Sequence, residues 1–166
     1  MEQYTALDAL KMAERLERNG AAFYRNAAMS AARVNKTQPY ILLNKLAIME
    51  DAHIRLFENM REGLSNGKHL DAGSDSQDES LLYLKLLVDT RVFFKKKINL
   101  NSITEIFTAA INAERDSIVF YLGIRELVSD AISKSQIDSI IKEEMKHIQL
   151  LGKELTAIKH DSDSSI

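Results

Sequence analysis

Apolar residues recur every three or four positions over long stretches of the chain, which is the spacing of α-helices with one buried face. Four such stretches predict four long helices, at about residues 5–33, 37–64, 102–128 and 135–158. Thr5 is expected to cap the first helix, and Ser102 forms a Ser-x-x-Glu capping box with Glu105 at the start of the third. The pattern predicts an all-α protein built as a four-helix bundle.

The connection between the second and third helices differs in composition from the helices around it. Residues 65–78 are mostly polar and predict a loop, whereas the apolar segment 81–94 predicts a short helix. A long connection between two tight helical hairpins is typical of a bundle whose second and third helices run in the same direction. The apolar residues exceed what one short connection needs, so some are expected to pack on the bundle or a second subunit: Tyr83, Leu84, Leu87, Val88, Phe93 and Phe94.

Length and composition indicate one domain of a soluble globular protein. We expect it to span residues 1–160, followed by a disordered polar tail at 161–166, in a chain of 166 residues with 45% hydrophobic content. The net charge of −2 argues against a nucleic-acid partner. No stretch of about 18 apolar residues and no signal-like N-terminus occurs, so no membrane association and a cytoplasmic location are expected.

A short motif that carries metal-ligand chemistry occurs twice. The pattern Glu-Arg-(Asn/Asp)-x-x-x-Phe-Tyr begins at Glu17 and again at Glu114, and one Glu-x-x-His follows each copy. The complete set is four carboxylates and two imidazoles: Glu17, Glu50, His53, Glu114, Glu144 and His147. This is the ligand inventory of a carboxylate-bridged dinuclear metal site inside a four-helix bundle. The chain has no cysteine, so any metal must be held by oxygen and nitrogen.

The hairpin geometry predicts that these six residues meet. Residues equally far from a turn on antiparallel helices lie at the same height. The point midway between Glu17 and Glu50 falls in the predicted turn after Arg33, and the point midway between Glu114 and Glu144 falls at Ser129-Asp130.

All six residues share helix faces with apolar neighbours, so they are expected to point into the core. Four buried carboxylates are strongly unfavourable unless they are compensated, and two divalent cations would balance their charge. Oxygen and nitrogen ligands suit iron or manganese, and zinc less selectively.

Several residues near this set have less specific patterns. Tyr24 and Tyr121 lie seven residues after Glu17 and Glu114, and either are core residues or donate hydrogen bonds to ligand carboxylates. Three more acidic residues fall off the apolar faces and are predicted to be surface charges: Glu14, Glu58 and Glu143. No role is predicted for His69 or His160.

The duplicated Glu-x6-Tyr and Glu-x-x-His motifs resemble the diiron domain of the rubrerythrin family, within the ferritin-like superfamily. The resemblance covers about Leu7 to Leu155 and fills all six ligand positions. It implies a ferritin-like fold, two iron ions, Glu50 and Glu144 as bridging carboxylates, and a homodimer. The chain lacks the rubredoxin-like domain of the family's full-length peroxidases, and Ser117 stands where those enzymes have an additional glutamate ligand.

Three functions are compatible with this sequence. The resemblance favours a diiron oxidoreductase that reduces hydrogen peroxide, or dioxygen, with electrons from an external donor such as rubredoxin. Iron binding or ferroxidase activity for iron handling, without peroxidase turnover, is an alternative. A third is a bundle with a degenerate or structural site that binds a partner.

Overall fold

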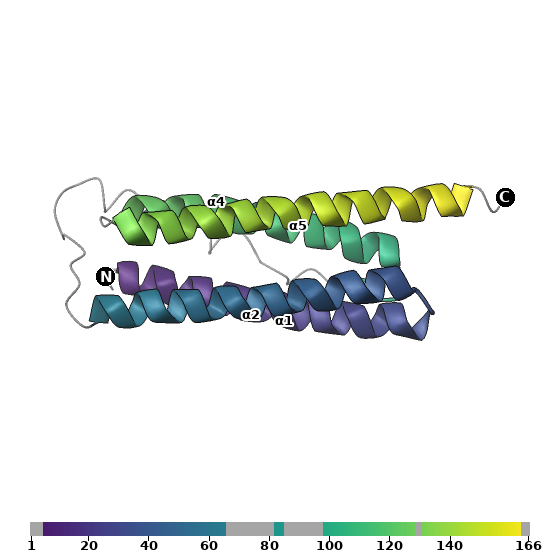
Figure 1. Cartoon of the computed structure of the whole chain (residues 1–166), viewed down its shortest axis with the longest axis horizontal. Coiled ribbons are helices and arrows are strands. Elements are labelled where there is room, and N and C mark those ends of the chain that lie inside the picture. Colours follow the sequence, from purple (N-terminus) through teal and green to yellow (C-terminus); the bar gives the residue numbers. More distant parts are fainter. Residues whose placement is uncertain (1–4, 66–81, 85–97, 129–130, 164–166) are drawn as a thin grey trace.

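The computed structural model describes residues 5–65, 82–84, 98–128 and 131–163, and these contain helices and no strand. Four long helices form an elongated bundle (Figure 1): α1 Ala6–Arg33, α2 Thr37–Ser65, α4 Ile103–Leu127 and α5 Ala131–Asp163. The predicted all-α, four-helix architecture is confirmed. None of the described helices is both long and apolar enough to cross a membrane.

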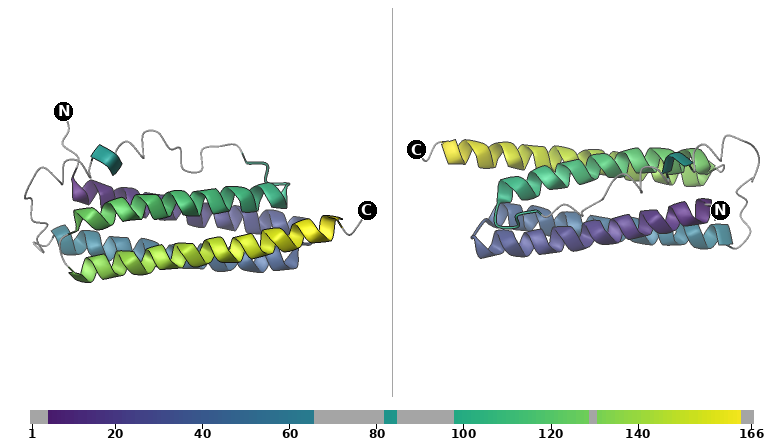
Figure 2. Two further views of the ribbon diagram at one scale, coloured as in Figure 1. Left: turned by 90° about the horizontal axis from the view of Figure 1, so that it is seen from above. Right: turned by 180° about the vertical axis from the view of Figure 1, so that it is seen from behind.

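The bundle consists of two antiparallel hairpins. Helix α1 packs mainly against α2, and α4 packs mainly against α5. Helices α2 and α4 run in the same direction, so the end of α2 and the start of α4 lie at opposite ends of the bundle (Figures 1 and 2). This arrangement confirms the expectation from the long connection.

The helix ends follow the local sequence. Thr5 caps α1 in a complete capping box with Asp8. At the start of α4, Ser102 accepts from the Glu105 N–H at 3.3 Å, but its own N–H donates to the Asn99 carbonyl at 3.0 Å. The capping box predicted there is therefore only half formed, because Asn99 takes the donor that Glu105 was expected to bind.

The turn between α1 and α2 requires a left-handed residue. Asn35 has φ 56°, and the next N–H, of Lys36, bonds back to the Ala31 carbonyl at 2.9 Å. Asparagine tolerates this conformation better than most residues do. The turn lies where the positions of Glu17 and Glu50 predicted it.

Two predicted boundaries differ from the structure. Helix α5 begins at Ala131 and ends at Asp163, so it is longer than predicted at both ends and extends into the predicted tail. The predicted turn at Ser129-Asp130 and the end of the tail, at 164–166, lie outside the described residues. So does the predicted short helix, except for residues 82–84, which are helical.

The buried apolar residues form two clusters, with a polar layer between them. One cluster contains residues from the start of α1, the end of α2, the end of α4 and the start of α5, including Leu10, Phe57, Phe120, Tyr121 and Ile140. The other contains residues from the opposite halves of the same helices, including Tyr24, Leu43, Leu46, Phe107 and Leu151. Every helix therefore passes from apolar to polar to apolar contacts along its length.

Leu84 anchors the connection between α2 and α4 to the bundle. It is fully buried in the first cluster, and a Cβ at Gly123 would lie only 2.6 Å from its Cδ2. Gly123 therefore makes room on α4 for this side chain. Leu84 confirms the packing expected of the connection, whereas Leu82 and Tyr83 are exposed. The other apolar residues named for this role lie outside the described residues: Leu87, Val88, Phe93 and Phe94.

Candidate metal centre

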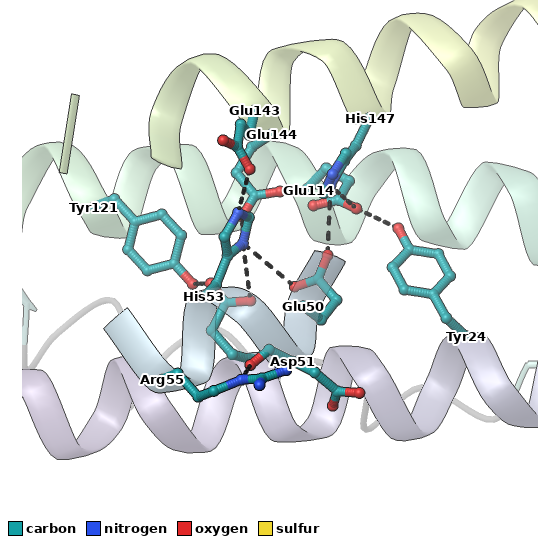
Figure 3. A network of polar contacts seen from close by, with 11 residues as sticks. Tyr24, Glu50, Asp51, His53, Arg55, Glu114, Tyr121, Glu143, Glu144 and His147 are labelled. Atoms are coloured by element: carbon teal, nitrogen blue, oxygen red, sulfur yellow. Dashed lines mark hydrogen bonds and ion pairs between the residues drawn. The ribbon is translucent and has the colours of Figure 1, made fainter. Parts of the chain in front are cut away.

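The polar layer contains all six predicted ligands. The structure brings them together in the interior, where each is at most 4% exposed: Glu17, Glu50, His53, Glu114, Glu144 and His147. Figure 3 labels all of them except Glu17. Each helix contributes one glutamate, and α2 and α5 each add the histidine one turn further on. The helical period places Glu and His at i and i+3 on one face, so the sequence pattern accounts for their convergence.

The six residues form two overlapping groups, each able to hold one metal ion. The group that we call the His53 position combines Glu17 and His53 with Glu50 and Glu144, and its ligand atoms lie within 4.8 Å of one another. The His147 position combines Glu114 and His147 with the same two glutamates, Glu50 and Glu144. Two carboxylates are therefore common to both positions, as a bridged dinuclear site requires.

His53 directs Nδ1 toward the carboxylates of its position. Nδ1 lies 3.2 Å from Glu144 Oε1, 3.5 Å from Glu17 Oε2 and 4.0 Å from Glu50 Oε2. The other ring nitrogen, Nε2, forms a 2.9 Å hydrogen bond with Glu143 Oε2 on the outer side (Figure 3).

His147 has the same inward orientation but a different outer environment. Its Nδ1 lies 2.8 Å from Glu144 Oε2, 3.3 Å from Glu114 Oε1 and 3.4 Å from Glu50 Oε1. Its Nε2 is buried and has no hydrogen-bond partner among the described residues. The two imidazole rings are nearly parallel, with centroids 5.9 Å apart.

Burial and mutual proximity shift the pKa values of the cluster strongly. Burial lowers the pKa of both imidazoles, but contacts with the surrounding carboxylates outweigh it and raise the pKa of His53 and of His147 to about 12. Burial and the charge of Glu144 raise the pKa of Glu114 to about 8. Burial and Glu17 raise the pKa of Glu50 well above its usual range. For Glu144, burial is outweighed by His147 and His53, which lower its pKa to about 2.

The chemistry of the donor atoms fits a pair of cations. Six inward atoms make no hydrogen bond of ordinary geometry with the described residues, although several approach one another in ion pairs: Glu17 Oε2, Glu50 Oε1, both carboxylate oxygens of Glu144, and Nδ1 of His53 and His147. Unsatisfied buried polar atoms are rare in native proteins. Carboxylate oxygens and imidazole nitrogens gathered in this way are the ligands that divalent first-row metals take.

Two tyrosines connect the hairpins across this layer. Tyr24 on α1 donates to Glu114 Oε1 on α4, and Tyr121 on α4 donates to Glu17 Oε1 on α1. Burial and the adjacent carboxylates raise the pKa of both phenols well above the usual value. Of the two alternatives open from the sequence, the structure favours hydrogen bonding to the predicted ligands, and each tyrosine reaches the glutamate of the other hairpin.

Two of the three predicted surface charges are not simple surface charges. Glu143 is partly exposed, but it forms a hydrogen bond with His53. Consecutive residues of a helix are rotated by about 100°, and this rotation turns Glu143 from the direction of Glu144 toward α2. Glu14 is only 8% exposed and pairs with Arg61, so the prediction for it is wrong. It lies one turn before Glu17 on the same face, and this spacing could have identified it. Glu58 pairs with Arg18 near the surface.

Comparison with known proteins agrees with this architecture. No family model and no curated protein matches the chain. A solved structure from Thermotoga maritima, described provisionally as a ferritin-like diiron-carboxylate protein, aligns over 98% of this chain and 99% of its own. The TM-score is 0.62 and the sequence identity is 21%. At this identity the similarity shows the fold, so the bundle is ferritin-like, while the resemblance to the rubrerythrin family stays a prediction.

Proposed function

We propose that this chain is a non-haem diiron oxidoreductase that reduces hydrogen peroxide or dioxygen with electrons from an external donor. The observation that carries the proposal is the pair of overlapping ligand groups that share Glu50 and Glu144. Two separate sites, or one site for a single ion, would not need shared carboxylates at the centre of the bundle.

Charge balance supports two divalent cations at this place. The four glutamates carry a charge of −4 when ionised, and two divalent ions with neutral histidines offset it. Iron is the metal that the proposed chemistry needs, while manganese or zinc could bind the same oxygen and nitrogen atoms. The description of the Thermotoga maritima protein as a diiron-carboxylate protein also supports the assignment.

The chemistry to be performed is a two-electron reduction. A pair of ferrous ions would supply one electron each, which together with two protons reduces hydrogen peroxide to two water molecules. The chain has no cysteine to hold a cluster of its own, so the electrons that restore the ferrous state come from a separate donor such as rubredoxin.

The protein's own residues would organise this reaction. Tyr24 and Tyr121 keep their protons, because their pKa values are raised, and hold one oxygen each of Glu114 and Glu17. That leaves Glu17 Oε2, which lies 3.5 Å from His53 Nδ1, to bind metal. In Glu114 the oxygen that Tyr24 holds, Oε1, is also the one 3.3 Å from His147 Nδ1, so the bond from Tyr24 fixes the orientation of this carboxylate. The apolar clusters on either side exclude bulk water, so the charge of the ions is weakly screened within the site.

The test begins with metal analysis of protein purified without added metal, followed by anaerobic loading with two ferrous ions per chain. Addition of one equivalent of peroxide, and separately of oxygen, should produce the absorbance of an oxo-bridged ferric pair. Glu50→Ala and Glu144→Ala should abolish peroxide-dependent oxidation while retaining helical circular dichroism. Glu126→Ala, which removes an exposed carboxylate on α4, is the matched control and should leave it unchanged.

Other outcomes would contradict the proposal. Less than about one metal ion per two chains would favour a structural or degenerate site. Iron oxidation without repeated turnover, when a reductant and peroxide are both in excess, would favour the alternative of iron handling.

A further inference from the structure

We propose that the two metal positions are unequal, and that the His53 position binds its ion more tightly and fills first because Glu143 holds the outer nitrogen of His53. This inference rests on the proposed function, since it requires both positions to bind metal. It concerns which position fills first and which residue outside the ligand set decides the order.

The first observation is the hydrogen bond between His53 and Glu143. Glu143 Oε2 lies 2.9 Å from His53 Nε2, on the side of the ring that faces away from the other ligands (Figure 3). A carboxylate accepts but cannot donate, so this contact places the ring proton on Nε2 and leaves the Nδ1 lone pair for a metal ion. It also increases the electron density that the imidazole can offer to a cation.

The second observation is the absence of such a partner on His147. Its side chain is fully buried, and Nε2 has no hydrogen-bond partner among the described residues. To bind metal through Nδ1, the neutral ring must carry its proton on Nε2, where the described residues offer no acceptor. An unsatisfied buried donor is unfavourable, so this requirement weakens binding at the His147 position.

The internal duplication explains the difference at the level of sequence. Glu50 and His53 on α2 correspond to Glu144 and His147 on α5, so the residue equivalent to Glu143, one before Glu144, is Met49. Helices α2 and α5 run in opposite directions (Figure 1). His53 on α2 contacts Glu143 on α5 (Figure 3). By the same relationship in the other half, Met49 is the residue expected opposite His147. A thioether accepts hydrogen bonds only weakly.

The partial exposure of Glu143 makes it well suited to this role. Its side chain is 42% exposed while its Oε2 reaches the buried ring, so the carboxylate keeps part of its hydration. A fully buried carboxylate in this place would add to the unfavourable charge of the four glutamates. Glu143 thus acts as a positioning residue that contacts a predicted ligand without belonging to either ligand group.

The expected effect is large enough to measure. Loss of a hydrogen-bond partner of a metal-binding histidine lowers metal affinity by about 10- to 100-fold in characterised sites. We therefore expect the two dissociation constants of the wild-type protein to differ by about this factor.

The experiment is an anaerobic calorimetric titration of the full chain with Co²⁺, combined with anomalous diffraction from crystals grown with one equivalent of Co²⁺. Two binding steps should appear, and at one equivalent the cobalt signal should concentrate between Glu17 and His53. The diffraction readout identifies the position directly and does not depend on activity.

Two substitutions with opposite effects test the role of Glu143. Glu143→Leu should weaken the tighter step by about 10- to 100-fold, so that the two steps merge and the cobalt signal divides between the positions. Met49→Glu should place an acceptor opposite His147 and strengthen the weaker step. Glu126→Gln removes one exposed negative charge without contacting an imidazole and should change neither step.

Different failures can be told apart. Two equal affinities in the wild-type protein, or a Glu143→Leu variant that retains both steps and the order of filling, would overturn this inference and leave the dinuclear site in place. Failure of the wild-type chain to bind two ions would overturn the proposed function as well.

Discussion

The Tyr24 hydroxyl on α1 donates a hydrogen bond to Glu114 on α4, across the interface between the two hairpins. The duplicated motif repeats this bond in the opposite direction, from Tyr121 to Glu17. Helices α1 and α4 share fewer contacts than the helices within each hairpin do. The two phenols therefore join the hairpins at the level of the ligands.

Replacing either tyrosine with phenylalanine should weaken both the fold and the metal centre. The loss of a buried donor to a carboxylate should cost about 1–3 kcal/mol of unfolding free energy, measured by urea denaturation. Tyr24→Phe should also lower affinity at the His147 position, because Glu114 is then held less firmly. Tyr40→Phe, at an exposed tyrosine, should change stability by less than about 0.5 kcal/mol. Equal effects of Tyr24→Phe and Tyr40→Phe would contradict the role of the phenol.

Glu50→Gln should change stability in opposite directions with and without metal. Burial and Glu17 hold the pKa of Glu50 well above 4.5, so the ionised form is unfavourable in the folded protein. A carboxyl group whose pKa is higher in the folded than in the unfolded protein stabilises the fold at pH values below its unfolded pKa. That stabilisation is lost as the pH rises from the unfolded pKa to the folded pKa. The metal-free variant should therefore be more stable than wild type near pH 7, and the difference should shrink toward pH 4.

The same variant should gain less stability from metal, because Glu50 belongs to both ligand groups. Urea unfolding of wild type and Glu50→Gln, with a chelator and with added Co²⁺, measures both effects. A metal-free variant that is less stable than the metal-free wild type at every pH would show that the ionised Glu50 side chain does not destabilise the folded protein.

Metal binding should release protons and strengthen as pH rises. The pKa values of His53 and His147 are raised to about 12, so both rings carry an extra proton at neutral pH before an ion binds. Coordination through Nδ1 must displace that proton. Each proton released makes affinity increase by about tenfold per pH unit. Titrations in buffers of different ionisation enthalpy should show at least one proton released per ion, and pH-independent binding would contradict this.

The convergence of the six predicted ligands could be derived from the sequence because it depends on local periodicity and on hairpin register. Glu50 and His53 share a face through the helical period alone, and Glu17 lies level with Glu50 because the turn that follows Arg33 lies midway between them. These relationships need no knowledge of how the two hairpins pack against each other.

Contacts between hairpins were harder to predict. Whether Tyr24 bonds to Glu17 or Glu114 depends on the rotation of α1 against α4, which periodicity does not define. Glu143 reaches His53 for a similar reason, because it lies at the edge of the α5 face and contacts a helix of the other hairpin. The sequence offered no clear signal for Glu143, because the residues around the two Glu-x-x-His pairs differ at several positions besides Met49 and Glu143.

The packing of Leu84 against Gly123 provides a test of how the α2–α4 connection is attached. A Cβ at position 123 would lie 2.6 Å from Leu84 Cδ2 and 3.2 Å from Leu84 Cγ, so Gly123→Ala should destabilise the protein by about 1–3 kcal/mol. Leu84→Ala should cost about 2–5 kcal/mol, because it removes a fully buried side chain.

The double variant should be more stable than the sum of the two single effects predicts, since the smaller side chain at 84 leaves room for the new methyl group. Gly152→Ala is the matched control: nothing lies within 4 Å of the added Cβ on α5, and alanine's higher helix propensity should stabilise the protein by about 0.5–1 kcal/mol. Urea denaturation of the four variants measures these terms. Strict additivity of Gly123→Ala and Leu84→Ala would mean that the two residues do not share one packing site.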